Sequence, residues 1–247
     1  MRQALHAEST KLRTVRGTGW LLLAAVALTI ALSVAAAAAA SCPSGGCSQD
    51  PTKISLTGVQ LGQAVIAILA VLVVSGEYST GMIHTTLAAI PRRPTVLAAK
   101  ALTVSGVVLG AGIVAVLGSL LAGRLLLPAL SLGDGPTLRA AVGSVLYLIL
   151  IALLSLGVAT AVRDPATAIG VVLALLYLFP ILAEMVTDPS WKRHLAQIGP
   201  MDAGLAIQKT TNLPGMPISP WAGLGVLTAW ATAALLAGAL LLHQRDA

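Results

Sequence analysis

Long apolar stretches dominate the chain and are separated by short polar connections. Six such stretches cover residues 20–40, 56–75, 96–123, 140–162, 166–186 and 221–242. Each approaches or exceeds the roughly 20 residues that a helix needs to cross a hydrocarbon core of about 30 Å. The segments of alternating polarity that form transmembrane β-strands do not occur. The pattern therefore predicts an all-α integral membrane fold with six transmembrane helices in one domain over residues 1–247.

Composition agrees with this prediction. The chain is 57% hydrophobic and only 10% charged, whereas a soluble domain carries about 25% charged residues. A soluble enzyme and a disordered chain are both excluded. The net charge of +6 indicates orientation rather than nucleic-acid binding, because Lys and Arg are retained on the cytoplasmic side of a membrane. With 3% aromatic residues there is no stacking platform for single strands. We expect both termini to be cytoplasmic and the partners to include membrane lipids but no nucleic acid.

The segment before the first span has two readings. Over residues 1–18, Met1, Leu5, Leu12 and Val15 recur at helical spacing, with basic residues elsewhere around the helix. This spacing predicts a helix that lies along the cytoplasmic interface. The alternative is a disordered basic tail that only sets the topology.

Two cysteines, Cys42 and Cys47, lie five positions apart directly after the first span. On an oxidising exterior they could form a local disulfide, and otherwise they are free thiols. No His lies nearby, so we expect no metal site there.

Signatures of catalysis are missing from the sequence. All four histidines fall outside the spans, and there is no His-Glu-x-x-His pattern and no Gly-x-Ser-x-Gly elbow. There is also no phosphate-binding loop. We therefore expect a chain that is not an enzyme and binds no cofactor of its own. Ion coupling would need an ionisable group within the bilayer. Glu184 is the clear candidate, either as a gate or as a carboxylate that reaches the interface, and Pro180 is expected to kink the same span.

Small residues recur at every fourth position in two spans and predict helix packing faces. They are Ala111, Ala115, Ser119 and Gly123 in the third span, and Gly225, Ala229, Ala233 and Ala237 in the sixth.

The connection between the second and third spans is the most informative stretch. Residues 77–90 predict a short cytoplasmic helix with Met82, Ile83, Thr86, Leu87 and Ile90 on its apolar side, ended by Pro91 and followed by Arg92 and Arg93. Such a helix lies on lipid or fits a groove of a partner. Arg92 and Arg93 could also serve only as positive anchors at the membrane.

These residues resemble a known family. Glu77-x-x-x-Gly81, the short apolar helix, Pro91-Arg-Arg and Lys100 at the start of the next span are similar to the coupling-helix region of ABC-type-2 export permeases, the membrane subunits of bacterial ATP-binding-cassette exporters. The basic helix before Trp20 is similar to their interfacial helix. Residues 188–220, with Ile198-Gly-Pro200 and Gly204-Leu-Ala-Ile207, are similar to their extracellular half-helices.

The resemblance implies that residues 77–90 sit in a cleft of a separate cytoplasmic ATPase subunit, which carries the ATP and Mg. The implied contact residues are Glu77, Tyr78, Gly81, Met82, His84, Thr86, Leu87 and Pro91, supported by Glu8, Lys11 and Leu12. A second permease copy or a related permease would complete the transporter in a bacterial plasma membrane.

The implied function is efflux of an amphipathic compound, peptide, lipid or drug. Two alternatives stay open. One is a membrane-anchored sensory or interaction subunit, and the other is a secondary transporter that depends on Glu184.

Overall fold

The computed structural model describes residues 16–40, 50–82, 93–128, 130–211 and 213–244. Within these residues the chain is helical and contains no strand. Six helical segments there are long and apolar enough to cross a membrane: Gly17–Ala39, Pro51–Tyr78, Pro94–Leu126, Gly135–Val162, Pro165–Glu184 and Pro220–Gln244. The predicted all-α membrane fold with six spans is confirmed. Of the predicted interfacial helix, residues 1–15 lie outside the described part.

The spans are built from the following elements. Spans one to three are α2 (Arg16–Ala39), α3 and α4 (Pro51–Ser55 and Val59–Ser79) and α6 (Arg93–Leu126). Spans four to six are α7 (Gly135–Val162), α8 with η1 and α9 (Pro165–Leu173, Ala174–Leu178 and Phe179–Glu184) and α12 (Pro220–Gln244). The short helices α10 (Pro189–Ile198), α11 (Pro200–Leu205), η2 (Ala206–Gln208) and η3 (Leu213–Gly215) precede the last span, as predicted for the segment 188–220.

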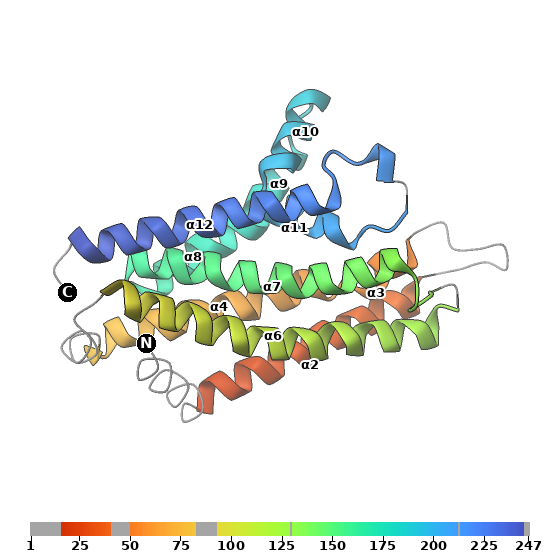
Figure 1. The fold of residues 1–247 in the computed structure, drawn as a ribbon. Helices are drawn as coiled ribbons and strands as arrows, with labels where there is room; N and C mark the ends of the chain where they lie inside the picture. The colour runs from red at the N-terminus through yellow and green to blue at the C-terminus, as the bar shows by residue number, and fades with distance from the viewer. Residues whose placement is uncertain (1–15, 41–49, 83–92, 129, 212, 245–247) are drawn as a thin grey trace.

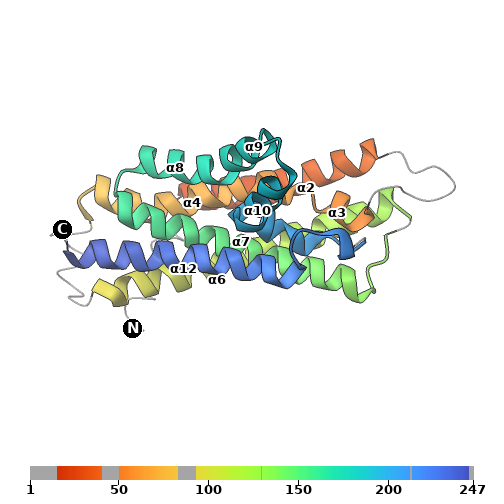
Figure 2. The same ribbon diagram turned by 90° about the horizontal axis from the view of Figure 1, so that it is seen from above.

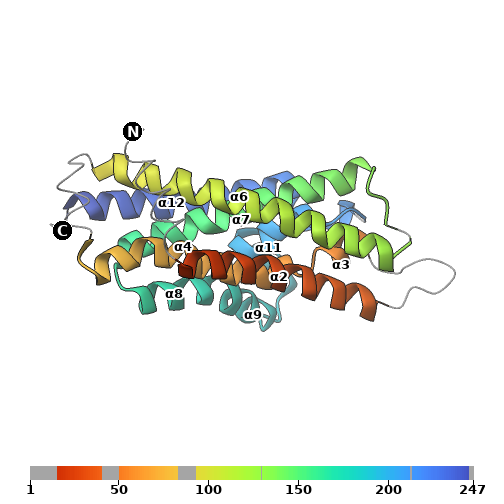
Figure 3. The same ribbon diagram turned by 90° about the horizontal axis from the view of Figure 1, so that it is seen from below.

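The spans form an elongated bundle (Figures 1–3). At one end, here called the terminal end, α12 finishes beside the end of α4, the start of α6 and the turn between α7 and α8 (Figure 1). The other end, here called the loop end, holds α3 and the connection between α6 and α7 (Figure 1). The two ends of the bundle are therefore built from different elements.

Asp-Pro pairs set the start of three helices. Asp50, Asp164 and Asp188 are the N-caps of α3, α8 and α10, and each is followed by proline in the first turn. Each carboxylate accepts a hydrogen bond from a backbone N–H of that turn, such as the bond of 2.7 Å from Thr167 N to Asp164. Backbone N–H groups in the first turn of a helix have no partner within the helix. Proline, which lacks an N–H, therefore costs no hydrogen bond at this position. These boundaries are thus encoded locally.

The central helix α7 packs against α12 through glycine. A Cβ added at Gly157 would lie 2.5 Å from the carbonyl carbon of Ala234, and one at Gly238 would lie 2.8 Å from the carbonyl oxygen of Gly157. Backbone therefore touches backbone, which is how membrane helices associate where lipid gives no hydrophobic drive.

Of the two predicted small-residue stripes, the one in the third span packs within the chain. Ala115, Ser119 and Gly123 are buried in the third span. The stripe of the sixth span, Gly225, Ala229, Ala233 and Ala237, is exposed and does not pack against another span of the same chain. The buried face of α12 instead carries Gly223, Leu224, Leu227, Ala231, Gly238 and Leu242.

The fifth span bends where proline interrupts it. The helix changes from α to π over Ala174–Leu178, directly before Pro180. Proline has no N–H to donate and its ring crowds the preceding turn, so the hydrogen-bond ladder is disturbed there. Beyond this point α9 and α10 turn away from the bundle (Figure 1).

Candidate functional site

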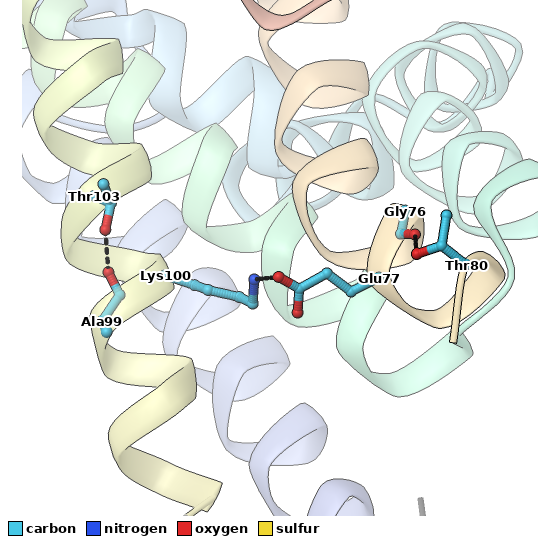
Figure 4. A network of polar contacts seen from close by, with 6 residues as sticks. All are labelled: Gly76, Glu77, Thr80, Ala99, Lys100 and Thr103. Carbon is cyan, nitrogen blue, oxygen red and sulfur yellow. Dashed lines mark hydrogen bonds and ion pairs between the residues drawn. The ribbon is translucent and has the colours of Figure 1, made fainter. Parts of the chain in front are cut away.

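A buried ion pair joins α4 to α6 at the terminal end. Lys100 Nζ lies 2.7 Å from Glu77 Oε1, and the side chains are only 4% and 7% exposed (Figure 4). Glu77 comes from the last turns of α4 and Lys100 from the early turns of α6. Charges buried within a membrane span are costly unless they are paired. The pair therefore fixes the two helices to each other on either side of residues 83–92.

A second contact joins α4 to the turn after α7. The guanidinium carbon of Arg163 lies 5.3 Å from the centre of the Tyr78 ring, within the range of a cation–π interaction. Arg163 is the C-cap of α7 and has a left-handed backbone, with φ of 67°. That conformation is unfavourable for a residue with a Cβ, so neighbouring contacts must hold it.

Arg163 also approaches the last span, since its Nη2 lies 3.5 Å from the carbonyl oxygen of Leu241 in α12. The end of α4 is thus in direct contact with α6 through Glu77 and with the α7–α8 turn through Tyr78. Together these residues form what we call the terminal junction: Glu77, Tyr78, Lys100 and Arg163.

The chain leaves α4 through a glycine turn. Thr80 is the C-cap and its Oγ1 donates a hydrogen bond of 2.7 Å to Gly76 O (Figure 4). Gly81 has φ of 71°, a conformation common directly after a helix and favourable for glycine. Met82 follows and is 44% exposed. The turn therefore ends α4 at the terminal end, with Met82 exposed.

The structure separates the predicted contact residues into three groups. Gly81 and Met82 are exposed at the terminal end, as a docking surface requires. Glu77 and Tyr78 belong to α4 rather than to a separate helix, which corrects the predicted start at residue 77. Glu77 faces inward, because its charge is stabilised by Lys100, and it is therefore a positioning residue. The others lie outside the described residues: His84, Thr86, Leu87, Pro91, Glu8, Lys11 and Leu12, and likewise Cys42 and Cys47.

Glu184 lies at the end of α9, away from the terminal junction. Its side chain is 72% exposed and forms an ion pair of 2.5 Å with Lys192 of α10. This position matches a surface carboxylate, whereas a gate would require a group within the bundle.

Polar side chains inside the bundle were not singled out from the sequence. Tyr147 of α7 is fully buried and donates a hydrogen bond to Gln63 Oε1 of α4. Tyr177 donates one to the carbonyl oxygen of Gln60. The sequence feature that could have identified them is a polar residue in an otherwise apolar span, since such a residue needs a hydrogen-bond partner there. Within the described residues no group of three His, Cys, Asp or Glu side chains could hold a metal ion.

Fold and site together define a multi-pass helical membrane protein whose inter-span connection is anchored by polar contacts. A family model described as ABC-2 family transporter protein matches residues 4–181, and the chain belongs to this family. It is a membrane permease subunit of an ABC transporter, and in this family a partner subunit hydrolyses the ATP. Membership also implies association with an ABC ATPase subunit. No curated protein matches the sequence significantly.

Proposed function

We propose that this chain is the permease subunit of an ATP-driven exporter in a bacterial plasma membrane, with amphipathic compounds, peptides, lipids or drugs as cargo. Its terminal end is cytoplasmic in this proposal, with both termini inside. The ATPase subunit docks on the connection from Gly81 to Pro91. A second permease, identical or related, completes the transport path.

The terminal junction is the observation that carries the proposal. A force on the connection reaches α4 and α6 together, because the Glu77–Lys100 pair of 2.7 Å joins them. It also reaches the α7–α8 turn through the contact between Tyr78 and Arg163. Closure of the ATPase subunits is thereby converted into a hinge or shear motion of packed helices.

The chemistry of the spans supports an amphipathic cargo. The sequence has few charged residues, and inside the described bundle the buried polar groups of Gln63 and Tyr147 are neutral. A small hydrophilic ion would need charged or strongly polar groups along its path.

Leu87→Glu tests the docking surface. This substitution places a charge on the apolar side of the predicted helix, so the ATPase subunit should no longer co-purify and transport should stop. The control is Leu125→Glu at the loop end, where the native side chain is 85% exposed. This control tests whether an added charge impairs membrane insertion without affecting the docking surface. Membrane insertion, ATPase recovery and vanadate-sensitive hydrolysis are measured for both variants. Full ATPase recovery and transport with Leu87→Glu would refute the assignment.

Orientation is tested separately by labelling. Single cysteines at Met82 and Thr211, in a chain with Cys42 and Cys47 replaced by Ser, are exposed to an impermeant maleimide on intact cells. We expect labelling at position 211 only, and labelling at position 82 would reverse the proposed topology.

A further inference from the structure

A cavity of about 230 Å³ lies between α3, the start of α4 and the segment before α12. Its polar lining includes two ammonium groups, from Lys53 and Lys209, one carboxyl group, from Asp202, two amides, from Gln60 and Gln208, and the hydroxyl of Thr57. Leu205, Met216 and Ile218 add apolar surface. The cavity therefore presents charges of both signs beside an apolar wall.

The cavity walls are held by hydrogen bonds to the bundle. Arg139 Nη2 of α7 donates a bond of 2.6 Å to the carbonyl oxygen of Lys209. Gln208 is 2% exposed and its Nε2 donates a bond of 3.1 Å to Ser144 Oγ. Gln197 donates one of 2.6 Å to the carbonyl oxygen of Pro217, which also lines the cavity. A wall fixed in this way is preorganised for a ligand, which lowers the entropic cost of binding.

The charged groups of the cavity lack ionic partners within the described residues. Lys53, Lys209 and Asp202 form no ion pair there. Burial raises the pKa of the Asp202 carboxyl, and the negative charge of Glu184 raises it further. A cation placed beside Asp202 would favour its ionised form. The cavity thus carries positive groups that suit an anion and a carboxyl group that suits a cation.

We propose that this cavity binds a zwitterionic headgroup in which a phosphate adjoins a protonated amine, as in phosphoethanolamine. Lys53 and Lys209 contact the phosphate, because charge-assisted hydrogen bonds to phosphate are strong. Asp202 accepts hydrogen bonds from the ammonium group. The apolar wall accommodates the first carbons of an attached chain. The ligand is either a membrane phospholipid or a soluble compound with the same headgroup, and the proposal does not depend on where an ATPase subunit docks.

Binding is measured on the full chain in nanodiscs by native mass spectrometry. Phosphatidylethanolamine and phosphatidylglycerol are compared as lipids, and phosphoethanolamine and glycerol 3-phosphate as soluble probes. The cavity variants are Lys53→Gln with Lys209→Gln, and Asp202→Asn. The control variants are Arg193→Gln and Asp134→Asn, which remove exposed charges of the same signs outside the cavity.

We expect the wild-type chain to retain phosphatidylethanolamine in preference to phosphatidylglycerol. The lysine variant should lose affinity by about tenfold or more, in line with the loss of a charge-assisted contact. Asp202→Asn should abolish the preference between the two lipids, and the controls should keep it. If phosphoethanolamine binds and the variants affect it in the same way, the cavity recognises the headgroup alone. If the lipid binds and phosphoethanolamine does not, the site also needs the acyl chain. Equal retention of both lipids by the wild type, or unchanged binding in both cavity variants, would overturn the proposal.

Discussion

Thr210 Oγ1 donates a hydrogen bond of 2.7 Å to Asp50 Oδ1, although 160 residues separate them. Thr211 N donates another, of 3.1 Å, to Asp50 Oδ2. Burial disfavours the charged form of Asp50, but the bonds from Thr210, Thr211 and Lys53 outweigh it and hold the pKa of this carboxyl below its ordinary value of 3.8. One carboxylate thus joins the start of span two to the segment before span six.

Asp50→Asn should lower the free energy of unfolding by about 1–3 kcal/mol at neutral pH, since it weakens hydrogen bonds to a partly buried charge. The folded-state pKa is lowered, so this stabilisation is present above about pH 3.8 and is lost as the pH falls through the folded-state value. Unfolding in detergent, followed by tryptophan fluorescence between pH 3 and 7, should show the difference from wild type shrinking below about pH 3.8.

The matched control is Asp134→Asn. Asp134 is the exposed N-cap residue of α7, and its side chain makes no capping hydrogen bond. This variant should unfold like the wild type at neutral pH. A stability difference for Asp50→Asn that grows as the pH falls would contradict the assignment.

The close contact between α7 and α12 can be tested by adding one methyl group. Gly157→Ala places a Cβ 2.5 Å from the backbone of Ala234, so α12 must shift. We expect a loss of about 1–3 kcal/mol in the free energy of unfolding, measured by titration with a denaturing detergent. Gly170→Ala on α8 is the control, because nothing lies within 4 Å of the added Cβ. It should be neutral or slightly stabilising, and equal effects at the two positions would argue against backbone packing.

The spans were predictable from the sequence because they depend on local physics. An apolar run of sufficient length must form a helix in a bilayer, since backbone groups find no other partners there. Asp50-Pro51 and Asp188-Pro189 likewise specify helix starts through their own side chains.

Which face of a span packs inward depends on its neighbours. The repeat Gly225, Ala229 and Ala233 satisfies the spacing of a packing face, yet the face that carries Gly223 and Ala231 is the buried one. Because the chain contains many alanines, several faces of this helix have small residues at the spacing of a packing face. Only the complementary backbone of α7 and α11 selects between them.

The candidate site shows the same division. Gly81 and Met82 follow a helix end that Thr80 and the glycine encode locally. In contrast, the pairing of Glu77 with Lys100 and of Tyr78 with Arg163 depends on how α4 lies against its neighbours. The sequence identified Glu77, Tyr78 and Lys100 as part of a connection between spans, but it could not show which neighbouring side chains they contact.

The buried pair at the terminal end should be worth more than the exposed pair between α9 and α10. Lys100→Met removes one charge of a pair whose side chains are 4% and 7% exposed. The expected cost is about 3–5 kcal/mol in the free energy of unfolding. A double-mutant cycle with Glu77→Gln should recover part of that cost, because the remaining partner is then uncharged.

Lys192→Met and Glu184→Gln provide the parallel cycle. That pair is 45% and 72% exposed, and a solvent-exposed pair contributes about 0–1 kcal/mol. Coupling energies of similar size in the two cycles would mean that Glu77 and Lys100 do not depend on each other in the folded chain.

Tyr78 provides a test of transmission, which rests on the proposed function. Its ring lies 5.3 Å from the Arg163 guanidinium carbon. Tyr78→Phe keeps a ring for the cation–π interaction, whereas Tyr78→Leu removes it. With the ATPase subunit bound, Tyr78→Leu should lower the transport rate per ATP hydrolysed by about threefold or more, while Tyr78→Phe should stay near wild type.

ATPase recovery on purification separates this effect from loss of docking. Both Tyr78 variants should bring down the ATPase subunit in wild-type amounts, because the ring contacts Arg163 at the α7–α8 turn, within the bundle. If Tyr78→Leu releases the ATPase subunit, Tyr78 belongs to the docking surface itself. If it transports normally with the subunit bound, transmission does not depend on the contact between Tyr78 and Arg163, and the contact to test next is the Glu77–Lys100 ion pair between α4 and α6.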